Sequence, residues 1–299
     1  MERPVTSTVE VKLGMLRGIL RNLGSVVTAF SGGADSAFLA FVAHEELGPD
    51  WALAVTAVSP SLAPEEEEAC RLLAAEWGLR WEAVHSDELA NPAYAANDGE
   101  RCYHCKAELM DVVGALLARL DRLAGAPHAR RAVVALGVNV DDLGEHRPGQ
   151  RAAAERGAVF PLVEAGFTKD EVRAASRMLG LPTWDKPAAA CLASRVPYGT
   201  PVTIGVLASV AQAESGLRAL GFAQLRVRHY GDLARIEVPV EDLGHVFDRR
   251  AAVVDAVRSA GYRYVTIDLE GFRSGNLNDV LSLSVTGAAA PRAPIEVDR

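Results

Sequence analysis

The chain has 299 residues, of which 49% are hydrophobic and 23% are charged, and its formal net charge is −8. This length leaves room for one large domain and a smaller one. No run of about 18 uninterrupted apolar residues occurs and the amino terminus lacks a signal-peptide pattern, so we expect a cytoplasmic protein that does not contact a membrane. The negative net charge disfavours nucleic acid as a partner, because nucleic-acid binders are attracted to phosphates over long range.

Four short apolar runs alternate with helical patterns in the first two thirds of the chain. The expected strands are residues 26–30, 52–58, 81–84 and 132–138, and the expected helices include 64–77 and 106–123. This alternation predicts an α/β fold with a doubly wound parallel sheet. Ligands bind beyond the carboxyl ends of such strands, so residues 31–36, the segment after Val58 and residues 137–142 should meet in a nucleotide cleft.

The pattern changes beyond residue 201 to that of a compact α+β unit. Its expected helices are 204–220 and 241–260, and its expected strands are 225–228, 234–238 and 264–268. We therefore predict a nucleotide-binding domain over 1–198, a smaller α+β domain for substrate binding or oligomerisation over 199–284, and a loose tail over 285–299.

Residues 31–36 read Ser-Gly-Gly-Ala-Asp-Ser, between an expected strand and an expected helix. Adjacent Gly32 and Gly33 let the backbone approach a polyphosphate, and the helix amides with the Ser31 and Ser36 hydroxyls supply donors. Asp35 either caps the helix or holds a magnesium ion on the phosphates. The GxGxxG and GxxxxGK[ST] loops are absent, so neither hydride transfer nor γ-phosphoryl transfer has a matching loop.

Three of the four cysteines lie in two places that suggest chemistry. Cys102 and Cys105 form a CxxC pair, which suits a redox disulfide, a zinc half-site or two iron–sulfur ligands. Cys191 is near Lys186 and Arg195, which could stabilise its thiolate as a nucleophile, although a small buried thiol is an equal alternative.

The remaining residues of interest each have a structural alternative. Cys70 lies on an apolar helical stretch and is expected to be an inert core thiol. Asp141 and Asp142 follow a strand and either bind a second metal ion or form a solvated turn. Arg226 and Arg228 alternate with apolar residues, so a strand would direct both guanidinium groups to one face, as an anion-binding pair or as part of a salt-bridge cluster.

The combination of motifs resembles the LarE-type sulfur transferases of the PP-loop ATP pyrophosphatase superfamily, over nearly the full length. The matching segments are 31–36, 58–62, 101–106, 137–142, 147–149, 191–199, 227–231 and 271–275, with Glu214 in an expected helix. The resemblance implies ATP-dependent sulfur insertion during synthesis of the nickel-pincer nucleotide, with a pyridinium biscarboxylic acid mononucleotide as substrate.

The resemblance also implies a division of roles among residues. A substrate carboxylate attacks the α-phosphorus of ATP, and Cys191 matches the cysteine that attacks the acyl adenylate and in one branch is left as dehydroalanine. In another branch three cysteines hold a 4Fe-4S cluster that carries sulfide from an external donor, and Cys102, Cys105 and Cys191 fit that branch, which we favour. The implied ATP-binding residues are Ser31, Gly32, Gly33, Asp35, Ser36, Ser59 and Gly137. The implied substrate-phosphate residues are Arg226, Arg228, Glu214, Arg273, Ser194 and Arg195.

Family members form homo-oligomers, as trimers of dimers, so a homo-hexamer is implied here. Two other functions remain open from the sequence. The first is a PP-loop tRNA thiolase, which the acidity of the chain disfavours. The second is a non-catalytic regulator that binds ATP, which would leave the three cysteines unexplained.

Overall fold

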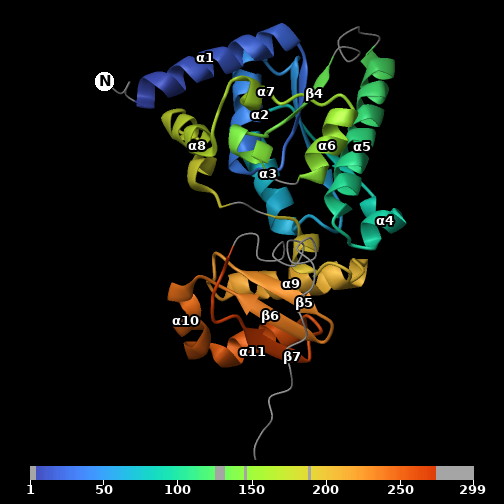
Figure 1. Ribbon diagram of the computed structural model, residues 1–299, viewed down its shortest axis with the longest axis vertical. Coiled ribbons are helices and arrows are strands. Elements are labelled where there is room, and N and C mark those ends of the chain that lie inside the picture. Colours follow the sequence, from blue (N-terminus) through green and yellow to red (C-terminus); the bar gives the residue numbers. More distant parts are fainter. Residues whose placement is uncertain (1–4, 125–131, 145–146, 188–189, 274–299) are drawn as a thin grey trace, which may run out of the picture.

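The structure is a computed structural model that describes residues 5–124, 132–144, 147–187 and 190–273. Four parallel strands form its central sheet in the order β3-β2-β1-β4 (Figure 1). They are β1 (Val26–Ala29), β2 (Ala52–Val58), β3 (Trp81–His85) and β4 (Val133–Leu136). These are the four expected strands, and all three pairings are parallel, which confirms the predicted fold class.

Helices cover both faces of this sheet. One face packs against α1 (Val5–Leu23), α2 (Ala34–Leu47), α3 (Pro64–Glu76) and α8 (Lys169–Met178), and the other against α5 (Arg101–Ala124) and α6 (Pro148–Glu155). The strands serve both layers because successive side chains alternate: Val26 packs with α1 and α2, and Val27 packs with α5. The sheet is therefore the middle layer of a three-layer arrangement, with the half-exposed β3 at one edge.

Helix α5 begins earlier than the expected 106–123. Its start is fixed by Asp98, whose side chain accepts a hydrogen bond from the Glu100 amide (2.8 Å) and whose carbonyl accepts one from the Arg101 amide (3.2 Å). The CxxC pair therefore lies inside the first turns of the helix and not before it, which corrects the expectation. Because Cys102 and Cys105 are three residues apart on a helix, they share a face.

A second sheet has the order β5-β6-β7, with β5 (Arg226–Tyr230) antiparallel to β6 (Leu233–Glu237) and β7 (Tyr264–Ile267) parallel to β6. Its core is shared with α9 (Ile204–Ala219) and α11 (Arg250–Ser259). The expectation of one helix over 241–260 is wrong. The chain forms α10 (Leu243–Asp248) and then α11, because Arg249 leaves the helical conformation (φ −104°, ψ 18°) and its guanidinium donates to the Leu220 carbonyl after α9.

Figure 1 places the two sheets toward opposite ends of the long axis. A third apolar cluster draws on both parts of the chain. This cluster joins Tyr94 of α4 (Pro92–Ala95), Leu192 of the 3-10 helix η5 (Leu192–Arg195) and Leu207 of α9. The domain boundary near residue 198 stays a prediction, and the tail over 285–299 lies outside the described residues. In the described ranges, no helix combines the length and apolarity that a membrane crossing requires.

Candidate active site

The loop from Ser31 to Ser36 turns tightly between β1 and α2. Gly32 has φ +66°, the Ser31 amide donates to Ser36 Oγ (3.2 Å), and Ser36 Oγ donates to the Gly33 carbonyl (3.1 Å). The first amides of α2 have no partners within the helix and carry the positive end of its dipole. The loop therefore has the form of an anion cradle at the carboxyl end of β1.

The loop after β4 contacts this cradle directly. A Cβ atom on Gly137 would lie 2.7 Å from the Ser36 nitrogen and 2.8 Å from the Asp35 carbonyl carbon, so only glycine fits. Asn139 Nδ2 donates to Asp35 Oδ1 (3.1 Å). The expected meeting of residues 31–36 and 137–142 is confirmed by these contacts.

Gly137→Ala should weaken ATP binding, because the added methyl would press on loop backbone that cannot move aside. Overpacking of this kind costs about 1–3 kcal/mol. Calorimetry of ATP binding and thermal unfolding would measure both effects. The matched control is Gly114→Ala on α5, where an added Cβ meets nothing within 4 Å. This substitution should leave ATP binding unchanged and should keep or raise the free energy of unfolding. Equal ATP affinity in the two variants would show that the close packing at Gly137 does not shape the ATP site.

The acidic residues at this edge already have protein partners. Burial raises the pKa of Asp35 above its usual value, with Asp142 adding to the rise and Asn139 and Lys169 opposing it. Asp142 accepts from the Asn139 amide (3.1 Å), and Asp141 accepts from the Lys169 amide (2.7 Å). Both carboxylates thus stabilise a turn, and their expected metal role is not tested by this geometry.

Ser59, at the end of β2, is tied to a buried glutamate that the sequence analysis missed. Ser59 Oγ donates to Glu88 Oε1 (2.5 Å), Ser86 Oγ donates to Glu88 Oε2 (3.0 Å), and Glu88 is 3% exposed. No local pattern distinguishes this glutamate from a surface one: Ser86 is a near neighbour in the sequence, and the sheet brings Ser59 to it.

Cys191 and the CxxC helix are held together by Asn97. This residue has φ +58°, which few side chains tolerate, and is fully buried. Its Nδ2 donates to the carbonyls of Pro197 and Thr200 (2.8 Å each), and its Oδ1 accepts from Arg101 Nη1. The segment after Cys191 is therefore hydrogen-bonded to the residues that start α5.

Arg101 is a buried cation between the two cysteine segments. Its Nη1 also donates to the Ala193 carbonyl (2.9 Å), and its guanidinium lies 5.6 Å from the centre of the Tyr198 ring. Burial alone would lower the pKa of Arg101, but the Cys191 and Cys102 thiolates raise it. The sequence offered one signal for this role, an arginine directly before a CxxC.

The three thiols differ in exposure. Cys102 and Cys191 are exposed, whereas Cys105 is half-buried. Burial raises the pKa of Cys105 to about 12; Lys106 opposes this rise, and Cys191, Glu88 and Cys102 add to it. The thiols therefore interact electrostatically, yet no three His, Cys, Asp or Glu side chains of the described residues are arranged to hold a metal ion. Cys70 is buried beneath residues 31–36, the loop that forms the anion cradle (the phosphate loop), as expected for a core thiol.

Arg195 connects the Cys191 segment to α9. Its Nη1 donates to the carbonyls of Ala190 (2.6 Å) and Cys191 (3.2 Å) and to Ser194 Oγ (3.0 Å). Its Nε and Nη2 donate to the two carboxylate oxygens of Glu214 (2.8 and 3.1 Å). Arg195 thus orients the backbone at Ala190 and Cys191. Lys186, which the sequence analysis placed near Cys191, forms an ion pair with Glu66 (2.7 Å).

Arg226 and Arg228 lie on one face of β5, as their spacing predicts. Val227 lies on the other face, in the core shared with α9 and α11. Arg228 donates to the Ser194 carbonyl (2.7 Å) and pairs with buried Glu237 (2.9 Å). The sequence analysis missed Glu237, whose partner reaches it through the β5–β6 register. Much of the charge of Arg228 is therefore balanced within the protein.

Arg226 is in a different electrostatic situation. It is 6% exposed, donates to the Arg273 carbonyl (3.3 Å) and lies 4.5 Å over the Phe272 ring. Burial, then Arg228 and Arg195, lower its pKa to about 10. Among the described residues no carboxylate forms an ion pair with Arg226, although Glu237 and Glu214 partly oppose the lowering of its pKa. The Arg273 side chain is exposed and pairs with Glu270.

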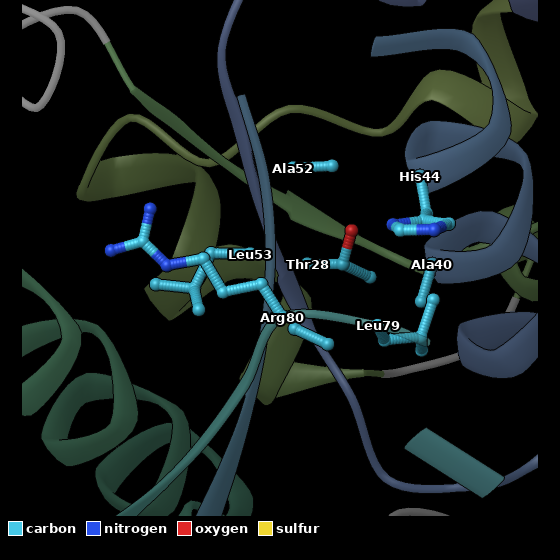
Figure 2. Close-up of a pocket in the computed structure, with 8 residues that line it drawn as sticks. Thr28, Ala40, His44, Ala52, Leu53, Leu79 and Arg80 are labelled. Carbon is cyan, nitrogen blue, oxygen red and sulfur yellow. The ribbon is translucent and has the colours of Figure 1, made fainter. Parts of the chain in front are cut away.

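A small hollow lies elsewhere, between the sheet and α2 (Figure 2). Figure 2 shows Thr28 and His44 beside it, with Ala52 at the start of β2. It leaves no room for a water molecule and lies away from the carboxyl ends of the strands. We therefore assign it to core packing and place the candidate site at the cradle and the cysteine segments.

The parallel sheet and the glycine-rich anion cradle after its first strand are consistent with a domain of the PP-loop ATP pyrophosphatase class. No protein-family model matches the chain. The chain is 37% identical over 276 residues, 92% of its length and 97% of the relative, to a pyridinium-3,5-bisthiocarboxylic acid mononucleotide synthase of Lactiplantibacillus plantarum. It belongs to this family, the LarE-type sulfurtransferases, which confirms the resemblance seen in the sequence.

Two other relatives have no established function. An uncharacterized protein of Synechocystis sp. is 45% identical over 92% of this chain and 99% of its own length. An uncharacterized protein of Methanocaldococcus jannaschii is 25% identical over 83% of this chain and 91% of its own length. The chain thus spans nearly the whole of each relative.

Proposed function

We propose that the protein is an ATP-dependent sulfurtransferase that converts a carboxylate of pyridinium-3,5-biscarboxylic acid mononucleotide to a thiocarboxylate, in nickel-pincer nucleotide synthesis. The observation that carries this proposal is the place of Cys191. This exposed thiol lies on a segment bonded on one side to Arg101 at the start of α5 and on the other to Glu214 of α9 and Arg228 of β5. The name of the Lactiplantibacillus relative supplies the product, a bisthiocarboxylic acid mononucleotide, and the substrate proposed here is the carboxylic acid that would precede it.

The first half-reaction activates the carboxylate at the phosphate loop. A substrate carboxylate oxygen attacks the α-phosphorus of ATP, the bond to the bridging oxygen breaks, and pyrophosphate leaves with the electron pair. Ser31, Gly32, Gly33 and Ser36 would hold the departing phosphates. Ser59 and Gly137 shape the same edge of the sheet. Asp35 is the proposed magnesium ligand, with Asp141 and Asp142 as weaker candidates, because a hard cation favours carboxylate oxygens.

The second half-reaction uses Cys191. Its thiolate attacks the acyl carbon and AMP leaves, which gives a thioester. Loss of the cysteine α-proton with cleavage of the Cβ–Sγ bond would then leave dehydroalanine and release the thiocarboxylate. Arg226 is the proposed ligand of the substrate phosphate. Its proposed neighbours in that role are Arg228, Arg195, Ser194 and Arg273, and Glu214 would hold Arg195 in place.

A 4Fe-4S cluster on Cys102, Cys105 and Cys191 is the proposed alternative to the loss of Cys191. When bound, such a cluster would supply an open iron for an external sulfide. The number of thiols supports it, since three cysteines would leave one iron open, whereas no three His, Cys, Asp or Glu side chains of the described residues are arranged to hold a metal ion. The cytoplasmic location and the homo-hexamer stay predictions.

Conversion of ATP to AMP and pyrophosphate, only in the presence of the pyridinium carboxylate, is the expected result that tests this function. Asp35→Ala should reduce the rate at least tenfold, because it removes the proposed magnesium ligand at the phosphate loop. Asp50→Ala, at an exposed aspartate after α2, is the control and should retain the rate. Formation of ADP and phosphate would show that the loop serves a different phosphoryl transfer.

A further inference from the structure

The phosphate loop contains no cation of its own. Residues 31–36 carry one acidic side chain and no lysine or arginine. ATP brings several negative charges to this loop, and the departing pyrophosphate gains more charge as the α–β bond breaks. Backbone amides orient such a group, and a nearby cation stabilises the charge that develops on it.

Lys186 reaches this loop from a distant part of the chain. Its Nζ lies 3.7 Å from the position that a Cβ atom on Gly32 would occupy, and its side chain is 23% exposed. The same ammonium acts electrostatically on the Cys70 thiol beneath the loop. The ammonium thus lies at the edge of the cradle, where solvent can reach it.

The backbone of Lys186 is fixed by two elements. Its amide donates to the Thr183 carbonyl (3.2 Å) in the 3-10 helix η4 (Pro182–Asp185). Arg173 of α8 donates to the carbonyls of Lys186 (3.0 Å) and Trp184 (3.1 Å). The lysine stem therefore starts from a rigid point, and its four carbons let the ammonium move over the loop.

The ammonium is held by a single carboxylate that is itself accessible. Glu66, in the first turn of α3, accepts from Lys186 Nζ at 2.7 Å, and its side chain is 28% exposed. A pair this exposed contributes little stability. A polyphosphate at the loop would offer the ammonium more negative charge than Glu66 does.

We propose that Lys186 is a phosphate-binding residue of the ATP site, and that Glu66 holds it at the loop edge and competes with the phosphates for it. The inference rests on the proposed use of ATP. When nucleotide binds, the ammonium exchanges the Glu66 carboxylate for phosphate oxygens and stays beside the pyrophosphate as it leaves. Removal of the Lys186 charge and removal of the Glu66 charge should therefore change the affinity for ATP in opposite directions.

Calorimetry of ATP and of pyrophosphate binding to the full chain tests this proposal. Lys186→Met should weaken both affinities about tenfold or more, the loss expected for one charged hydrogen bond. Lys186→Arg should restore most of the affinity. Glu66→Gln should tighten both, since it frees the ammonium.

Lys12→Met is the matched control. Lys12 also pairs with a glutamate, Glu171, at 2.6 Å, and its side chain is 22% exposed, but it lies between α1 and α8. Its loss should leave ATP binding unchanged.

Wild-type affinity in Lys186→Met, or equal weakening in Lys186→Met and Glu66→Gln, would overturn the proposal and leave the pair a structural one. If Lys186→Met does not fold, Lys186→Arg and Glu66→Gln still decide, because a structural pair predicts no tightening in Glu66→Gln. The proposed function fails separately, if the wild-type protein yields ADP and phosphate.

Discussion

Cys191→Ser is expected to form AMP and pyrophosphate at close to the wild-type rate and to make no thiocarboxylate. The two half-reactions use different groups: activation takes place at the phosphate loop, and sulfur delivery requires a thiol. Serine keeps the shape of the side chain and the hydrogen bonds that Arg195 makes to the Ala190 and Cys191 carbonyls. Pyrophosphate release measures the first half-reaction, and mass spectrometry of the product measures the second.

The fate of Cys191 in the wild-type protein then separates the two sulfur routes. If the cysteine is consumed, its mass falls by that of H₂S after one turnover and activity stops. If a cluster forms, protein reconstituted without oxygen should hold about four irons per chain and Cys191 should keep its mass. Undiminished sulfur transfer by Cys191→Ser would contradict both.

Among the substitutions predicted for this protein, Glu214→Ala should cause the largest loss in the free energy of unfolding. Glu214 is fully buried, pairs with Arg195 and Arg218, and accepts from the Val227 amide at 3.0 Å. Removal of one partner of a buried pair leaves an uncompensated charge and costs about 3–5 kcal/mol. Urea unfolding monitored by circular dichroism would measure this free energy.

Two further variants make this prediction specific. Glu214→Gln keeps the side-chain volume and should lose less stability than the alanine variant. Glu65→Ala removes an exposed partner of the same Arg218 (3.8 Å) and should cost about 0–1 kcal/mol. A loss below 1 kcal/mol in Glu214→Ala would mean that solvent replaces the carboxylate and that this part of the core is open.

The sequence predicted the features that depend on local pattern. The apolar runs became β1 to β4, and the adjacent glycines after β1 became the phosphate loop. Helix α1 was missed although the sequence contains a signal for it. Val9, Leu13, Leu16 and Leu20 follow helical spacing, and all four are buried. The break at Arg249 could not be predicted, since it depends on a hydrogen bond to the Leu220 carbonyl.

The site was predicted less completely than the fold, and the reason is distance along the chain. Arg226 and Arg228 could be assigned to one strand face, because alternation is local. Glu237 and Glu88 could not be assigned, because one partner of each, Arg228 for Glu237 and Ser59 for Glu88, is brought near only by the folded sheets. Lys186 was expected beside Cys191 because the two are close in sequence, yet the turn after α8 directs it to the phosphate loop.

The left-handed conformation of Asn97 limits how this chemistry could be transplanted. Residues 190–202 alone, grafted onto another PP-loop scaffold, would carry the thiol and lose the amide that fixes the carbonyls of Pro197 and Thr200. A working graft would have to include residues 94–101, nearly a hundred positions upstream. A graft of the cysteine motif by itself would lose the hydrogen bonds that give its backbone a defined shape, and a complete one would also need Glu214 and Arg228, which bind Arg195 and the Ser194 carbonyl.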